Sequence, residues 1–75
     1  MNDNEEAVTV LKLDIELNLT GPMQALVNKQ AAALLRSVAD RLEKDDLQDG
    51  FEEINDENGN QIGEIYVDYS DMITY

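Results

Sequence analysis

The sequence predicts an α+β domain of β-α-β-β order, in which one helix packs on one face of a three-stranded antiparallel sheet. Three observations carry this prediction. Residues 11–19 alternate apolar with polar side chains, residues 22–44 repeat apolar side chains with helical spacing, and residues 51–67 form two β-prone runs around an Asn-Gly turn. A length of 75 residues fits a single domain with one small core.

The first predicted strand has one apolar and one polar face. The apolar face holds Leu11, Leu13, Ile15, Leu17 and Leu19, at every second position. This period of two is typical of a strand with one buried side. Val8 and Val10 extend the strand but fall on its polar face. We therefore assign Val8 and Val10 to self-association, in a possible homodimer formed through the long exposed edge of this strand.

A helix is predicted over residues 22–44. Gly21-Pro22 ends the strand, and a proline at the first helical position loses nothing by lacking its N–H. At about 100° per residue, one apolar set falls within an arc of about 120° and forms the predicted core face. This set is Met23, Val27, Ala31, Leu34, Leu35, Val38 and Leu42.

A hairpin is predicted from residues 51–55 and 61–67. Asn58-Gly59 lies between the two runs, and both residues tolerate the positive φ that a tight hairpin turn needs. A three-residue loop makes Asp56 face Asn60. The same register makes Ile54 face Ile62 and puts Phe51 on one face with Ile65.

The apolar parity of the hairpin changes along its length, which predicts a bulge near Gly63 or at Glu52–Glu53. Residues 70–75 are expected to form a tail or a short final turn. Residues 1–6 and about 70–75 are expected to be flexible. A right-handed crossover and antiparallel neighbours throughout give the strand order first, third, second.

The net charge of −12 is concentrated after residue 44. Residues 1–44 carry seven acids and five bases, whereas residues 45–75 carry ten acids and no base. Such a field repels nucleic acid and anionic membranes and attracts basic surfaces. Plain solubility is the alternative explanation of the charge, and the sequence leaves it open.

Several features that are common in enzymes and metal sites are missing. The chain has no cysteine and no histidine, and its four glycines are too far apart for a phosphate-binding loop. Residues 56–64 alternate oxygen-bearing side chains as a calcium loop does, but Gln61 and Val67 stand where that loop needs glycine and glutamate. We expect no catalytic residues, no cofactor, no metal site and no enzymatic activity. We also expect no membrane span and a cytoplasmic location, because the first residues are acidic where a signal peptide is basic.

Two segments carry a resemblance. Residues 33–43 read ALLRSVADRLE, and residues 56–63 read DENGNQIG. Together they resemble a group of short phage- and prophage-encoded proteins that share an LLRxxADRLE helix and a DxNGNxIG hairpin. The resemblance covers residues 31–67 and implies an origin more than a mechanism. By analogy of size and charge alone, small acidic phage proteins include anti-CRISPR inhibitors that mimic nucleic acid in charge.

The expected function is that of a small protein-binding module in a bacterial host cell. It would inhibit a defence or nucleic-acid-handling complex by occupying its basic surface, without binding nucleic acid itself. The predicted partner-binding residues are Asp45, Asp46, Asp49, Glu52, Glu53, Asp56, Glu57, Glu64, Tyr66, Asp68, Tyr69 and Asp71. The alternative is a homodimeric structural or assembly accessory protein of a phage, with no inhibitory role.

Overall fold

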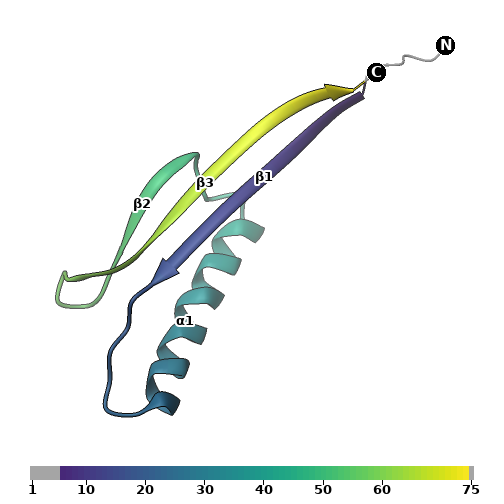
Figure 1. The fold of residues 1–75 in the computed structure, drawn as a ribbon. Helices are drawn as coiled ribbons and strands as arrows, with labels where there is room; N and C mark the ends of the chain where they lie inside the picture. The colour runs from purple at the N-terminus through teal and green to yellow at the C-terminus, as the bar shows by residue number, and fades with distance from the viewer. Residues whose placement is uncertain (1–5, 75) are drawn as a thin grey trace.

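A computed structural model describes residues 6–74, and the side chains of residues 8–71. The elements are β1 (Glu6–Leu17), α1 (Gln24–Glu43), β2 (Gly50–Asn55) and β3 (Gln61–Thr74). The sheet has the order β1-β3-β2 with antiparallel neighbours, and α1 packs on one of its faces (Figure 1). The fold class and strand order predicted from the sequence are confirmed.

The strand β3 is longer than the sequence predicts. Residues 70–74 belong to β3 and pair with Glu6–Val10 of β1, so the expectation of a tail or turn there is wrong. These residues carry few apolar side chains, and their strand depends on pairing with a distant segment. The expectation for residues 1–5 and Tyr75 lies outside the described residues.

The strands β1 and β3 extend beyond the end of β2. β1 and β3 pair from Glu6↔Thr74 to Leu17↔Gly63, whereas β2 joins β3 only from Gly50↔Val67 to Asn55↔Gln61. Residues 6–12 and 68–74 therefore form a two-stranded ribbon, here called the arm. Figure 1 shows the arm projecting away from the helix and β2.

The hairpin turn has the predicted three-residue loop. The Asp56 N–H donates to the Asn60 carbonyl at 2.9 Å, and Gly59 has a φ of 85°. The predicted bulge near Gly63 is confirmed, because the register shifts so that Ile54 pairs with Gly63. The expected pairing of Ile54 with Ile62 is therefore wrong.

Because of the bulge, the side chains of Phe51 and Glu52 lie on the faces of the sheet opposite to those predicted. Phe51 pairs with Tyr66 on the face away from the helix, and Glu52 pairs with Ile65 on the helix side, so Phe51 and Ile65 do not share a face. A side chain at position 63 would meet the backbone oxygen of Glu16. Glycine at this position therefore allows β1 and β3 to approach closely beside the bulge.

The core is small and lies between α1 and the three-stranded part of the sheet. Its buried side chains are Val38, Leu47, Ile65 and Val67, with Leu13, Ile15, Leu42 and Ile54 packed around them. The predicted helix face is only partly correct, because Met23 is 58% exposed and Leu35 is 46% exposed. Met23 is the N-cap residue of α1, and Leu35 is exposed beside the partly buried Leu34, so the buried stripe of the helix is shorter and narrower than predicted.

The loop after α1 contributes a core residue that periodicity did not reveal. Asp45 adopts a φ of 55°, its N–H donates to the Leu42 carbonyl, and the Asp46 N–H donates to the Arg41 carbonyl. This pair of bonds is a Schellman motif, which ends the helix with one left-handed residue. The motif turns the chain back and places Leu47, 5% exposed, in the core.

Candidate protein-binding surface

The face of the sheet opposite α1 places three glutamates side by side. The register pairs Glu16 of β1 with Glu64 of β3, and Glu64 with Glu53 of β2. Directly paired residues of an antiparallel sheet project from the same face, with Cβ atoms about 4.5–5.5 Å apart. Three carboxylates therefore form one row across all three strands.

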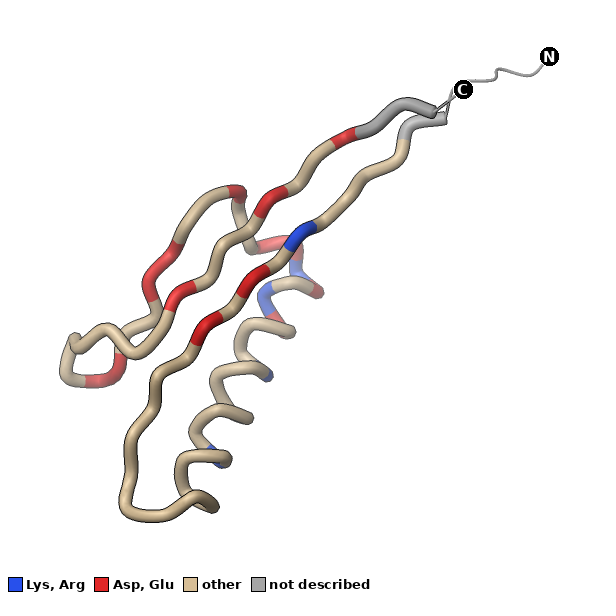
Figure 2. Tube along the Cα trace, viewed as in Figure 1, with Lys and Arg blue, Asp and Glu red and all other residues tan. Residues whose placement is uncertain are grey.

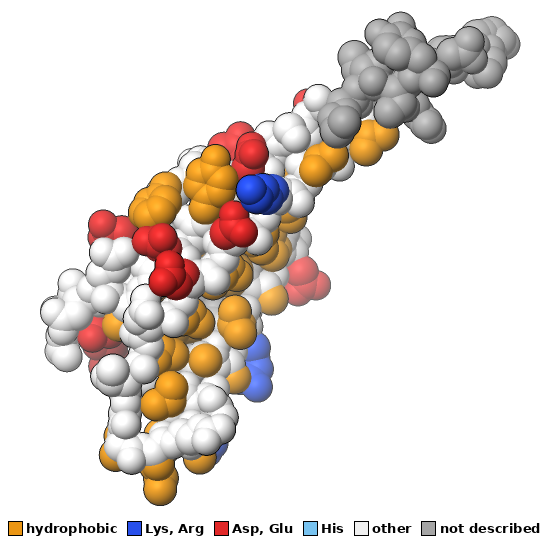
Figure 3. Space-filling model, viewed as in Figure 1, with side chains coloured by type: hydrophobic (Ala, Val, Ile, Leu, Met, Phe, Trp, Pro, Cys, Tyr) orange, Lys and Arg blue, Asp and Glu red, His pale blue; other side chains and the backbone are white. Residues whose placement is uncertain are grey.

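The next rows of this face combine aromatic and charged side chains. Asp14, Tyr66 and Phe51 form the second row, and Lys12 pairs with Asp68 in the third. Phe51 is 60% exposed and Tyr66 is 42% exposed. Figure 2 shows acidic positions on all three strands, and Figure 3 shows acidic and hydrophobic side chains next to each other on this side.

We call this surface the acidic face. It consists of Asp14, Glu16, Phe51, Glu53, Glu64, Tyr66 and Asp68, together with one base, Lys12. Within the described residues, the ion pairs are Arg41–Glu52 and Lys44–Asp40, so no carboxylate of the acidic face is ion-paired. Its negative charge is directed to solvent with little compensation inside the protein.

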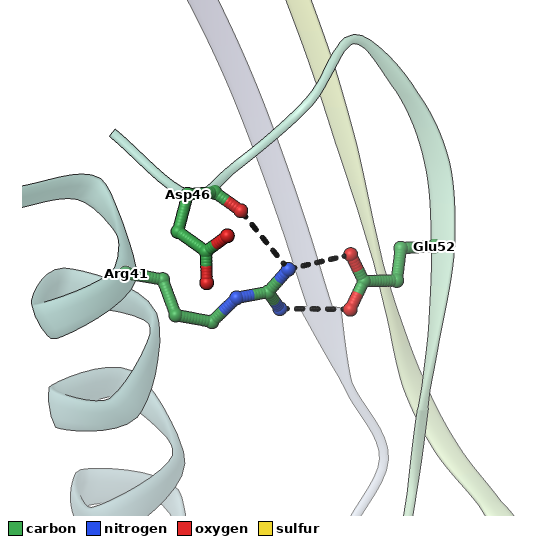
Figure 4. Close-up of polar contacts among 3 residues, drawn as sticks. All are labelled: Arg41, Asp46 and Glu52. Carbon is green, nitrogen blue, oxygen red and sulfur yellow. Dashed lines mark hydrogen bonds and ion pairs between the residues drawn. The ribbon is translucent and has the colours of Figure 1, made fainter. Parts of the chain in front are cut away.

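Glu52 lies on the opposite side of the sheet, where it forms an ion pair within the protein. The Arg41 guanidinium donates to its two carboxylate oxygens at 2.7 and 3.0 Å, and also to the Asp46 carbonyl at 3.5 Å (Figure 4). The hydrogen bond from Arg41 holds the pKa of Glu52 below its usual value, and the same bond raises the pKa of Arg41. This ion pair ties α1 to the edge strand β2.

Two other acids from the predicted binding set also have internal partners. The Asp56 carboxylate accepts the N–H groups of Asn60 and Asn58, each at 2.9 Å, and the bond from Asn60 contributes most to lowering the pKa of Asp56. The Asp49 carboxylate accepts the Tyr69 N–H at 2.8 Å. Both carboxylates stabilise connections between strands.

The predicted binding residues do not form one surface. The acidic face brings together Glu53, Glu64, Tyr66 and Asp68. Asp45 and Asp46 lie in the turn after α1, and Glu57 lies in the hairpin turn. Tyr69 and Asp71 belong to the other face of the arm, where Asp71 accepts a hydrogen bond from the Thr9 hydroxyl at 3.2 Å.

Sequence reasoning missed Asp14, Glu16 and Phe51 as members of this surface. Asp14 and Glu16 lie in the half of the sequence with nearly balanced charge, but the strand order places β1 directly beside β3. The signal was present, because the alternation of the first strand already assigned both acids to its polar face. The acids of the acidic face share one face of the sheet, although they come from both halves of the sequence.

The comparisons with known proteins give no identity. No protein family matches the sequence, and no curated protein and no solved structure matches it either. Among the described residues, no helix is long and apolar enough to cross a membrane.

Proposed function

We propose that the chain is a protein-binding module whose acidic face occupies a basic, nucleic-acid-binding surface of another protein. The observation that carries the proposal is the row Glu16–Glu64–Glu53. Like charges directly opposite each other destabilise a sheet, and solubility does not require the carboxylates to be adjacent. A lysine- or arginine-rich surface would neutralise this repulsion on binding.

The spacing of the acidic face supports a dense contact with cationic side chains. Neighbouring strands lie about 4.8 Å apart, and side chains on one face repeat about every 6.8 Å along a strand. Phe51 and Tyr66 lie beside the glutamate row and offer exposed aromatic area. Aromatic residues are enriched in protein interfaces, and tyrosine is among the residues that contribute most binding energy there.

The biological role that fits this surface is inhibition by competition. A protein that occupies the groove of a nucleic-acid-handling complex excludes its DNA or RNA. The resemblance of residues 31–67 to short phage proteins favours a bacterial defence complex as the target, such as a CRISPR effector in the host cytoplasm. Complementary charge would accelerate association and make the affinity fall with added salt.

The test compares two variants of equal net charge. The first neutralises the row with Glu16→Gln, Glu53→Gln and Glu64→Gln, and the control carries Glu43→Gln, Asp45→Asn and Glu57→Gln, outside the acidic face. Each protein is used to purify partners from bacterial lysate at low and high salt, and the partner captured by the wild type is then titrated with its DNA or RNA.

The expected outcome is that the wild type and the control capture the same nucleic-acid-binding protein and displace its nucleic acid, whereas the row variant does neither. High salt should release the partner from the wild type. Capture and displacement by the row variant at wild-type affinity would refute the proposal.

A further inference from the structure

The arm exposes apolar side chains on both of its faces. Val8 and Val10 are 42% and 38% exposed on one face, and Leu11 and Tyr69 are 43% and 37% exposed on the other. Neither β2 nor the core reaches this part of the sheet. An isolated two-stranded ribbon is marginally stable in water, so a third strand alongside the arm would supply the missing burial.

The outer edge of β1 is open to such a strand. Tyr69 pairs with Leu11, and its N–H points away from β1 because it donates to Asp49 on the β2 side. Leu11 is then in a pair without mutual hydrogen bonds, and its own N–H and carbonyl point to the free edge. Alternation along the strand gives the same direction to Thr9 and Leu13.

Two copies of the chain also repel each other little along this edge. Residues 7–13 contain no acid and one base, Lys12, in a chain of net charge −12. A partner of the acidic face must be basic. The edge of the arm, in contrast, presents a nearly neutral, apolar strand. Its charge therefore fits a second acidic copy that presents the same segment.

We propose that a second copy of this chain pairs antiparallel with the arm edge of β1 and joins two sheets into one of six strands. A two-fold axis through the arm makes the contact isologous, so that the arm edge of β1 faces the same edge of the second copy. Val8 and Val10 then meet the second copy on one face of the joined sheet, and Leu11 meets it on the other.

The dimer and the proposed function respond oppositely to salt. Pairing of two acidic chains should strengthen as salt screens their repulsion, whereas binding to a basic partner should weaken. The dimer is measured on the purified protein alone. A negative result for the dimer therefore does not contradict partner binding by the acidic face. A negative result for partner binding likewise does not contradict the dimer.

The first experiment measures mass in solution by sedimentation over a range of protein and salt concentrations. The wild type should be dimeric, and more tightly so at high salt. Leu11→Pro removes one edge N–H without breaking a bond to β3 and should be monomeric, with unchanged far-ultraviolet circular dichroism. Leu11→Val keeps the N–H and should remain dimeric. A monomeric wild type at every concentration, or a folded Leu11→Pro dimer as stable as the wild type, overturns the proposal.

The second experiment locates the two-fold axis. The chain has no cysteine, so single substitutions Val8→Cys, Val10→Cys and Leu11→Cys each introduce one reactive thiol. Cα atoms directly opposite across an antiparallel pair lie about 4.5–5.5 Å apart, within the range of a disulfide. Mild oxidation should yield covalent dimer most rapidly at one arm position. Equally rapid cross-linking of Asn58→Cys in the hairpin turn would show random collision and contradict the dimer.

Discussion

Both terminal nitrogens of Arg41 in α1 donate hydrogen bonds to the Glu52 carboxylate of β2, at 2.7 and 3.0 Å. The pair crosses from the only helix among the described residues to the outer edge of the sheet. It exists because the bulge at Gly63 turns Glu52 toward the helix.

The ion pair should make a pH-dependent contribution to stability. Because the folded-state pKa of Glu52 is lowered from 4.5, its contribution is present above that value and is lost as the pH falls through the folded pKa. Both side chains are partly exposed, so a double-mutant cycle with Arg41→Met and Glu52→Gln should give a coupling of about 0.5–1 kcal/mol near pH 7.

Urea unfolding of the four proteins of this cycle measures the coupling. Acidification should remove the coupling between Arg41 and Glu52. As a control, Glu57→Gln changes an exposed acid of the hairpin turn and should leave the free energy of unfolding nearly unchanged at neutral pH. A coupling that persists after Glu52 is protonated would mean that packing of the Arg41 side chain, and not charge, holds α1 to β2.

Neutralising the centre of the glutamate row should stabilise the protein. Glu64 has a carboxylate neighbour on each side, whereas Glu16 and Glu53 have one each within the row. Glu64→Gln should therefore raise the free energy of unfolding by about 0.5 kcal/mol, more than either outer substitution. Chemical unfolding at low salt measures the gain, which should shrink as salt is added. A loss of stability in Glu64→Gln would show that the row does not repel itself.

Asp45→Gly should also stabilise the fold. Asp45 is the left-handed residue that ends α1, with a φ of 55°. Glycine has no Cβ to oppose this conformation, so we expect a gain of about 0.5–1 kcal/mol, with a smaller gain for Asp45→Asn. Thermal unfolding measures the order of the three proteins. Because Asp45 lies outside the acidic face, binding to a basic partner should be unchanged.

Two leucines should respond very differently to truncation. Leu47 is 5% exposed, so Leu47→Ala should cost about 2–3 kcal/mol. Leu35 is 46% exposed, and Leu35→Ala should cost less than about 1 kcal/mol. Equilibrium unfolding of both variants compares the two costs. Equal costs would place Leu35 in the core, as helical periodicity alone had predicted.

The elements and their order were predictable because the signals are local. Alternation defines β1, helical spacing defines α1, and Asn58-Gly59 defines the hairpin. Register was not predictable to the residue, because a slip of one position moves each side chain to the opposite face. The faces of Phe51 and Glu52 depended on where the bulge fell, and the sequence left two positions open for it.

The acidic face was predictable only in part for the same reason. Glu53, Glu64 and Asp68 were among the expected binding residues, but Asp14 and Glu16 join them through pairing of distant strands. Leu47 was missed because a Schellman motif without glycine carries no periodic signal. Residues 70–74 were missed because their strand exists only through β1.

The pairing of β1 with β3 sets the order in which the protein becomes complete during synthesis. Thr9 and Asp71 are hydrogen-bonded although they are 62 residues apart in the chain. β1 leaves the ribosome early and has no strand to pair with until β3 follows, a delay of several seconds at about 5–20 residues per second. During this interval its apolar face stays uncovered, so a nascent chain is the form most open to capture by chaperones. Folding should accordingly be slow for the size of the domain, since its largest strand pair closes the longest loop.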